Sequence, residues 1–258
     1  MTAAEQQTGQ QRGPQPGPRI DIAELSGAVF DTDGVLTDTA SLHSAAWKRM
    51  FDEYLRERAE RTGEPFVPFD QASDYIDHID GKARAAGASS FLASRGITLT
   101  PEDLRALTDR KDGYFLDALH EQGARPYTGS LDFVRRLRAG GLPTAVVSAS
   151  KHCAEVVRSA GAESLFDVRV DGVDAADLGL PSKPDPAIFL EAARRLGSPP
   201  ETTLVVEDAL AGVEAGRRGG FGRVVGVDRG AGDALAEHGA DLVVADLSEI
   251  ALTAEERR

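Results

Sequence analysis

Two aspartates separated by one residue, Asp31 and Asp33, directly follow the short apolar run Gly27–Phe30. A carboxylate can attack phosphorus and form an acyl-phosphate, which divides one difficult transfer into two easier steps. A second carboxylate two residues later can lie on the same side and exchange a proton with the leaving or entering oxygen. The spacing therefore predicts Asp31 as a nucleophile and Asp33 as a general acid and base. The alternative is that the pair only forms an Asp–Gly turn.

Ser148 and Lys183 also carry groups that suit phosphate. Ser148 directly follows the apolar run Thr144–Val147, and Lys183 lies in a Pro-rich loop before a helical pattern. A hydroxyl and an ammonium group can stabilise the negative charge that spreads over the phosphoryl oxygens during transfer. We therefore expect both side chains to face the transferred phosphate. The alternative for Lys183 is a solvated loop lysine.

Glu207 and Asp208 form a second acidic pair, at the end of the apolar run Thr203–Val206. Mg²⁺ prefers oxygen ligands and commonly takes one or two carboxylates together with phosphate and water. We expect Asp31, Asp208 and the Asp33 carbonyl group to bind Mg²⁺. Glu207 either touches the metal as well or orients a water bound to it.

Apolar runs alternate with helical patterns along most of the chain. This alternation predicts an α/β fold, in which a parallel sheet has right-handed crossovers and helices on both faces. Ligands bind beyond the carboxyl ends of the strands in such a sheet, so the polar residues named above are expected to converge there. Residues 51–122 are charged and helical in pattern, and they interrupt the alternation as an insertion. The predicted strands are Gly27–Phe30, Thr144–Val147, Val168–Val170, Thr203–Val206, Arg223–Val227 and Leu242–Val244.

The composition narrows the range of partners. The formal net charge of −13 disfavours nucleic acid and anionic membrane surfaces, so neither is an expected partner. No apolar run approaches the roughly 18 residues that a membrane helix needs. The single cysteine, Cys153, excludes an intramolecular disulfide and suits a reducing cytosol. We expect a cytoplasmic protein, acting as a monomer on a small molecule.

The run Phe30–Thr39, FDTDGVLTDT, resembles the nucleophile motif of the haloacid dehalogenase superfamily. Ser148, Lys183 and the pair Glu207–Asp208 match its second, third and fourth motifs in the same order. The resemblance covers the chain from about Ile20 to its end. It implies a Rossmann-like parallel-sheet core with an inserted helical cap, and Mg²⁺-dependent phosphotransferase activity. The organisation expected from it is a disordered tail at 1–20, a core domain at 21–40 and 125–258, and a cap domain at 41–124.

Further runs resemble the β-phosphoglucomutase subgroup, namely Asp38–Ala40, His43, Ala46–Lys48, Val147–Lys151, Ser182–Pro184 and Val206–Ala209. This resemblance implies a cap that closes over a small phosphorylated sugar, with Arg84 holding a second phosphate. The side chains implied at this distal site are Arg84, Ala149, Ser150, Lys151 and Lys111. Those implied at the hinge between core and cap are Thr39, His43 and Trp47. His152 departs from the subgroup pattern, which usually has a smaller amide at this position.

Several of these residues also have structural interpretations. Thr39 could cap the following helix, and His43 and Trp47 could simply pack under the cap because they lie four residues apart on one helix face. Arg84 could be one of the exposed arginines of a charged insertion.

Four functions are compatible with an activated aspartate on such a sheet. The first is a mutase that interconverts β-glucose 1-phosphate and glucose 6-phosphate through a bisphosphate. The second is a phosphatase for small sugar phosphates, in which water accepts the phosphoryl group. A halide-removing hydrolase needs no metal, so it would leave Asp33 and Asp208 without a task. A non-catalytic phospho-acceptor domain would need neither Asp33 nor a cap.

Overall fold

The computed structural model describes residues 17–80 and 82–254, and its centre is a six-stranded parallel sheet. The strands lie in the order β4-β3-β2-β5-β6-β7, so the chain winds outward from β2 in both directions. Their bounds are β2 Gly27–Asp31, β3 Thr144–Val147, β4 Val168–Val170, β5 Thr203–Glu207, β6 Arg223–Val227 and β7 Leu242–Val244. The central strands are apolar throughout because helices cover both faces of the sheet.

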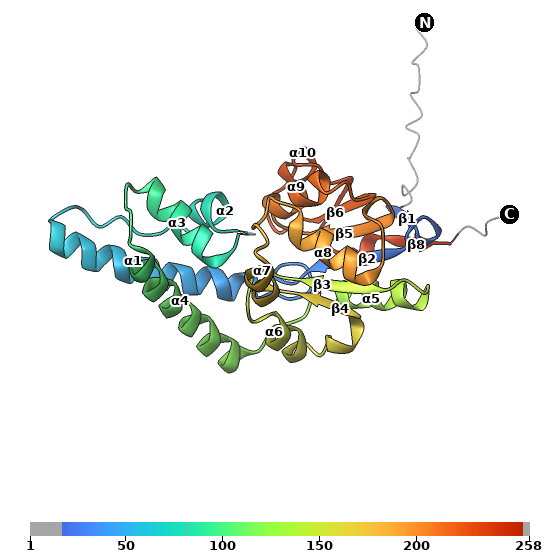
Figure 1. The fold of residues 1–258 in the computed structure, drawn as a ribbon, viewed down its shortest axis with the longest axis horizontal. Coiled ribbons are helices and arrows are strands. Elements are labelled where there is room, and N and C mark those ends of the chain that lie inside the picture. Colours follow the sequence, from blue (N-terminus) through green and yellow to red (C-terminus); the bar gives the residue numbers. More distant parts are fainter. Residues whose placement is uncertain (1–16, 81, 255–258) are drawn as a thin grey trace, which may run out of the picture.

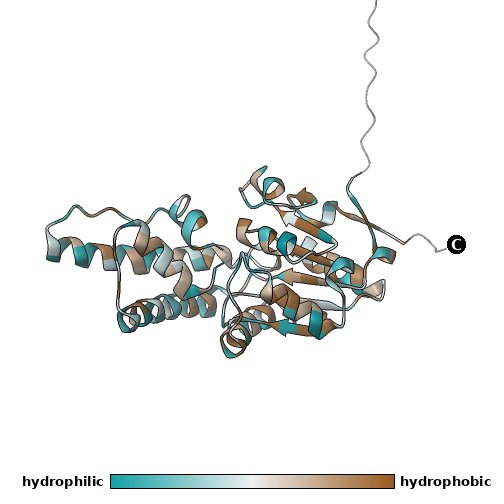
Figure 2. Ribbon diagram, turned by 45° about the horizontal axis from the view of Figure 1, so that its top comes forward, coloured by the Kyte–Doolittle hydropathy of each residue, from teal (hydrophilic) through white to brown (hydrophobic). Residues whose placement is uncertain are grey.

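Helices flank the sheet in two layers (Figure 1). One face packs against α5 and α6, and the other against α8, α9 and α10. Their apolar residues recur at helical spacing, as in Leu131, Val134 and Leu137 of α5, and the hydrophobic colour in Figure 2 follows the strands and the inner faces of the helices. The helices of this part are α5 Thr128–Ala139, α6 Cys153–Ser159, α7 Gly172–Leu178, α8 Ala187–Leu196, α9 Leu210–Arg218 and α10 Ala234–Glu237. Short 3₁₀ turns occupy Ile22–Glu24, Glu163–Leu165, Pro200–Thr202 and Leu247–Glu249.

A separate group of helices extends from the sheet between β2 and α5 (Figure 1). Its members are α1 Ala40–Thr62, α2 Asp74–His78, α3 Arg84–Ser94 and α4 Pro101–Gln122. An aromatic cluster holds it together: Phe51 stacks on Trp47 and on Phe69, and Phe69 meets Phe91 edge to face. This group therefore has a hydrophobic core of its own, distinct from the two cores of the sheet.

The chain leaves the sheet for these helices and returns from them at one place. Thr37 pairs with Pro126, and the Asp38 backbone N–H donates to the Arg125 carbonyl at 2.8 Å. Two adjacent segments thus connect the helical group to the sheet, and the position of one constrains the other.

The α/β fold and the predicted strands are confirmed, but the expectation for the start of the chain is partly wrong. Arg19 and Ile20 were expected in a disordered tail, whereas they belong to β1, Arg19–Asp21. This strand pairs in parallel with β8, Ala251–Thr253, and buries Ile20 to 3% exposure. The buried apolar side chain and the paired backbone stabilise the segment. Residues 1–16 of the predicted tail lie outside the described residues.

No helix among residues 17–80 and 82–254 is both long and apolar enough to cross a membrane.

Candidate active site

Asp31, the last residue of β2, is held by a buried cation. Lys183 Nζ donates to Asp31 Oδ1 at 2.5 Å and also to Glu207 Oε1. All three side chains are at least nine-tenths buried. Burial raises the pKa of Asp31, and Lys183 opposes that shift. Burial would lower the pKa of Lys183, but the charges of Asp31 and Glu207 outweigh it and raise the pKa. Lys183 is thus a buried, permanently charged partner of Asp31 and not a solvated loop lysine.

Glu207 and Asp208 differ sharply in their surroundings. Glu207 Oε1 accepts from Lys183, and its Oε2 accepts from the backbone N–H groups of Asp208 and Ala209 at 2.7 Å each. The carboxylate fits closely against Gly212, where a β-carbon would lie 1.8 Å from Oε1. Asp208 lines the cavity as Glu207 does, and burial together with the charge of Glu207 raises its pKa well above the ordinary value. Asp208 is therefore the member of the pair that can accept a cation.

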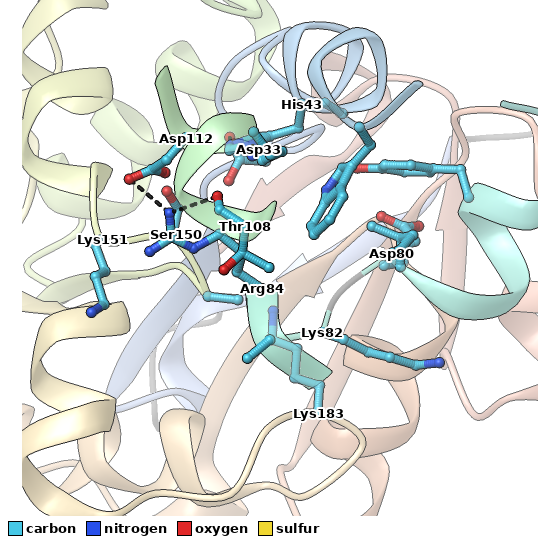
Figure 3. A pocket seen from close by; sticks show the side chains of 18 of the residues that line it. Asp33, His43, Asp80, Lys82, Arg84, Thr108, Asp112, Ser150, Lys151 and Lys183 are labelled. Carbon is cyan, nitrogen blue, oxygen red and sulfur yellow. Dashed lines mark hydrogen bonds and ion pairs between the residues drawn. The ribbon is translucent and has the colours of Figure 1, made fainter. Parts of the chain in front are cut away.

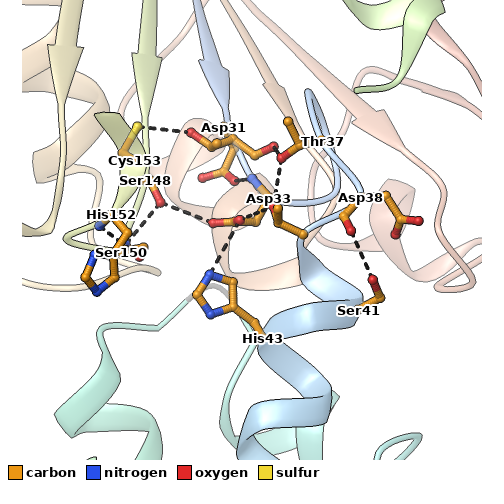
Figure 4. A network of polar contacts seen from close by, with 12 residues as sticks. Asp31, Asp33, Thr37, Asp38, Ser41, His43, Ser148, Ser150, His152 and Cys153 are labelled. Atoms are coloured by element: carbon orange, nitrogen blue, oxygen red, sulfur yellow. Dashed lines mark hydrogen bonds and ion pairs between the residues drawn. The ribbon is translucent and has the colours of Figure 1, made fainter. Parts of the chain in front are cut away.

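Asp33 lies beside Asp31 and is surrounded by hydrogen-bond donors (Figure 4). Thr39 Oγ1 donates to Asp33 Oδ1, and Ser148 Oγ donates to Oδ2 at 3.2 Å. Burial raises the pKa of Asp33, and these two hydrogen bonds oppose the shift. Thr39 makes no capping hydrogen bond to the following helix, so the helix-cap interpretation is wrong. Both hydroxyls orient the Asp33 carboxylate.

His43 connects Asp33 to the helical group. Its ring stacks on Phe115 at 3.8 Å between centroids, and Lys111 Nζ lies 2.6 Å from His43 Nδ1. Burial, followed by the charge of Lys111, lowers the pKa of His43 well below its usual value, and burial lowers that of Lys111 to about 7. When Lys111 donates to Nδ1 of the neutral His43 ring, the ring hydrogen must lie on Nε2. This nitrogen is 3.5 Å from Asp33 Oδ1. His43 thus does more than pack under the cap.

Arg84 contributes to the site from the helical group, at the start of α3 (Figure 3). Its guanidinium contacts Asp112 Oδ2 at 2.7 Å and donates to the Thr108 carbonyl at 3.3 Å. Asp112 Oδ1 in turn lies 3.0 Å from His152 Nε2, in the loop after β3. Arg84 is therefore a paired side chain that lines the site, and not an exposed arginine of the insertion.

A cavity of about 660 Å³ is lined by residues of both the sheet and the helical group. Its lining includes, of the residues predicted from sequence, Asp31, Asp33, His43, Trp47, Arg84, Lys111, Ala149, Ser150, Lys151, Lys183, Glu207 and Asp208. Ser148 and Thr39 do not line it, but both hydrogen-bond to Asp33, which does. Trp47 both lines the cavity and packs in the aromatic cluster at 4% exposure. The fold thus brings every predicted site residue to one place.

Sequence reasoning missed several polar lining residues, among them Tyr75, Asp80, Arg105 and Asp112. Asp112 directly follows Lys111, and this adjacency was the only available signal. The others lie in a charged helical segment, where nothing in the pattern separates a lining residue from a solvated one. Only the packing of α2 and α4 against the mouth of the cavity reveals them.

The oxygen groups at the carboxyl ends of β2 and β5 suit a divalent cation. Asp31 and Asp208 both face the cavity, and burial raises the pKa of each carboxyl group. Among residues 17–80 and 82–254, no three His, Cys, Asp or Glu side chains could hold a metal by themselves. Mg²⁺ does not require such a cluster, because it commonly takes one or two carboxylates with water and phosphate oxygens. The donor set therefore fits Mg²⁺.

Residues 25–220 match the family of haloacid dehalogenase-like hydrolases. The chain belongs to this family. It is 46% identical to a β-phosphoglucomutase of Mycobacterium tuberculosis over 240 residues, covering 88% of this chain and 92% of that protein. It is 30% identical to a phosphorylated carbohydrates phosphatase of Thermotoga maritima, covering 85% and 94%. A solved β-phosphoglucomutase structure from Clostridium difficile shares its fold, with a TM-score of 0.70, 24% identity, and coverage of 87% and 92%.

This haloacid dehalogenase-like hydrolase is thus an enzyme of the phosphotransferase and hydrolase type that resembles β-phosphoglucomutases. The predicted superfamily and subgroup resemblances are confirmed.

Proposed function

We propose that this enzyme carries out Mg²⁺-dependent phosphoryl transfer through an aspartyl-phosphate on Asp31, as a β-phosphoglucomutase. One observation carries the proposal: Asp31 and Asp33, at the end of a sheet strand, line the same cavity as Arg84 of the helical group. A substrate with two phosphates, one on either side of a sugar, fits this arrangement. The sequence likeness to a mycobacterial β-phosphoglucomutase supports the same function.

Asp31 begins the reaction by attacking phosphorus, while the bond from phosphorus to the leaving oxygen breaks. Lys183, charged and 2.5 Å from Asp31, offsets negative charge that gathers on the phosphoryl oxygens. Asp33 gives a proton to the leaving oxygen, and its raised pKa suits this role. Thr39 and Ser148 orient the Asp33 carboxylate for the transfer.

A sugar hydroxyl completes the cycle by losing its proton to Asp33 and attacking the phosphorus on Asp31. With β-glucose 1-phosphate the product is a bisphosphate, which reorients and returns its other phosphate to Asp31, releasing glucose 6-phosphate. Arg84 would grip the phosphate that is not being transferred, since a guanidinium can donate two parallel hydrogen bonds.

Asp31, Asp208 and the Asp33 carbonyl group would hold Mg²⁺. The cation would neutralise charge on the transferred phosphoryl group. Glu207 has both oxygens engaged, so its part is to hold Lys183 and the backbone of Asp208 and Ala209 in place. We therefore propose that Glu207 does not itself touch the metal.

A sugar-phosphate phosphatase is the second candidate. Asp112 already pairs with Arg84, which weakens the case for a strong second phosphate site. The likeness to the Thermotoga maritima phosphatase also favours this candidate.

For either function we propose the same substrate class and organisation. The substrate is a small phosphorylated sugar, and the enzyme is a cytoplasmic monomer. Its core carries a cap that closes over the sugar.

Product analysis tests the function. The purified protein is mixed with β-glucose 1-phosphate, a trace of glucose 1,6-bisphosphate and Mg²⁺. A mutase forms glucose 6-phosphate, and the trace of bisphosphate shortens any lag. Release of free phosphate instead would favour the phosphatase, and the absence of both products would contradict the proposal.

A further inference from the structure

Asp112 is a carboxylate placed where a second phosphate would bind. It lies on α4, next to Lys111, with 26% of its side chain exposed. One of its oxygens contacts Arg84 of α3 at 2.7 Å, and the other contacts His152 of the loop after β3 at 3.0 Å. It thus links a cation of the helical group to a side chain of the sheet domain. A phosphate bound between the same two elements would make the same pair of contacts.

His152 keeps a hydrogen-bonding group for such a ligand. Its Nε2 is buried and lies 3.0 Å from Asp112 Oδ1, but it makes no hydrogen bond to any of the described residues. A buried nitrogen without a hydrogen bond is costly, so a ligand oxygen that satisfies it would be favoured. The site therefore holds an anion, Asp112, that occupies Arg84 and leaves His152 incompletely bonded.

Asp112 carries its charge under ordinary conditions. Burial acts to raise its pKa, but the interaction with His152 and the charge of Arg84 lower it to about 2. A phosphate dianion that approaches Arg84 therefore meets a negative charge fixed beside it. The Asp112 carboxylate and a phosphate bound to the same arginine would repel each other strongly in a partly buried site.

We propose that Asp112 is a specificity-determining residue that competes with the distal phosphate of the substrate for Arg84. This inference rests on the function proposed above. In the free enzyme Asp112 pairs with Arg84 and draws His152 toward the helical group. A substrate with a second phosphate must displace this carboxylate from Arg84, so Asp112 weakens the binding of bisphosphates. The strength of the distal site, and with it the balance between mutase and phosphatase behaviour, is set by this one side chain.

The test measures binding of glucose 1,6-bisphosphate to proteins that carry Asp31→Asn, so that no phosphoryl group is transferred. Trp47 is the only tryptophan in the chain and lines the cavity, so its fluorescence reports binding. Adding Asp112→Asn is expected to lower Kd about tenfold, because it removes a like charge while keeping the shape of the side chain. The difference should shrink at high salt.

Asp109→Asn is the matched control. Asp109 lies one turn earlier on α4 and lines the same cavity, but it is 62% exposed and 4.0 Å from Arg84. Its effect on Kd should stay below about twofold, since solvent screens exposed charges. Circular dichroism and thermal melting check that each variant folds, and Asp112→Ser replaces Asp112→Asn if the amide disturbs α4.

The outcomes are distinct. A Kd that is unchanged or higher in the Asp112 variant overturns the inference and leaves the proposed function standing. An equal tightening by Asp109→Asn also overturns it, because the effect would then be one of general charge. Failure of the bisphosphate to bind to the Asp31→Asn protein overturns the proposed function and this inference with it.

Discussion

Gly34 leaves the space that the carboxylate of Asp208 occupies. A β-carbon at Gly34 would lie 1.8 Å from Asp208 Oδ2, and the φ angle of Gly34 is +84°. Gly34 is therefore required twice, once by its backbone conformation and once by the carboxylate of Asp208, which follows the neighbouring strand β5.

Replacing Gly34 by alanine should disable the metal site. The added methyl group must push the Asp208 carboxylate away from Asp31, so the Mg²⁺ concentration for half-maximal activity should rise by about tenfold or more. Gly63→Ala is the matched control, because Gly63 has φ +74° but nothing within 4 Å. It should cost only about 1 kcal/mol of stability and leave Mg²⁺ dependence unchanged.

A chelator should stop the wild-type reaction, and added Mg²⁺ should restore it. Activity that is indifferent to chelation would remove the metal from the proposed mechanism.

Asp31→Asn should abolish turnover without unfolding the protein. An amide cannot form the acyl-phosphate, so the loss in kcat should be at least about 10³-fold. The variant should also fail to take up ³²P-labelled phosphoryl groups from substrate. Activity of even a few per cent of the wild-type value would argue against a covalent Asp31 intermediate.

Arg84→Ala should separate the two candidate functions. Loss of the guanidinium should lower mutase turnover by about 100-fold, because the second phosphate would lose its charged partner. Hydrolysis of a small phosphate ester should change by less than about threefold. Arg105→Ala is the control, since Arg105 is an exposed arginine that lines the same cavity. Equal losses in both variants would show that the cavity attracts phosphate by general charge alone.

Lys111 should make stability depend on pH. Its pKa in the folded protein is about 7, below its ordinary value of 10.5. Between these pH values the unfolded chain therefore binds more protons than the folded protein. The cost of burying the Lys111 charge is fully present below pH 7, and it disappears as pH rises, so the free energy of unfolding increases with pH. Between pH 7 and 9 the free energy of unfolding of the wild-type protein should increase by about 2 kcal/mol, and that of Lys111→Met should not show this increase. Urea unfolding at both pH values measures this.

Lys151→Met provides the comparison for that experiment. Lys151 lines the same cavity but is exposed, so its removal should leave the pH dependence of unfolding as it is in the wild-type protein. A parallel pH profile for Lys111→Met and the wild-type protein would show that Lys111 is not buried as a nearly neutral amine.

The catalytic edge of the sheet was predictable from sequence for a physical reason. A strand buried on both faces is a continuous apolar run, so its end is visible wherever a polar residue interrupts it. Asp31, Ser148 and Asp208 each stand at such an end, and parallel strands bring their carboxyl ends to one edge. Their convergence follows from local pattern and topology alone.

Tertiary structure decided the properties that depend on contacts between distant segments. Sequence alone favoured Asp208 as a metal ligand but left two roles open for Glu207. The approach of Lys183 and of two backbone N–H groups engages both oxygens of Glu207. Thr39 reads as a helix cap, yet it bonds Asp33 because the chain turns back on itself at Gly34. Asp112 meets His152 only because α4 packs beside the loop after β3. Charge and burial at these positions arise from packing, which no local pattern encodes.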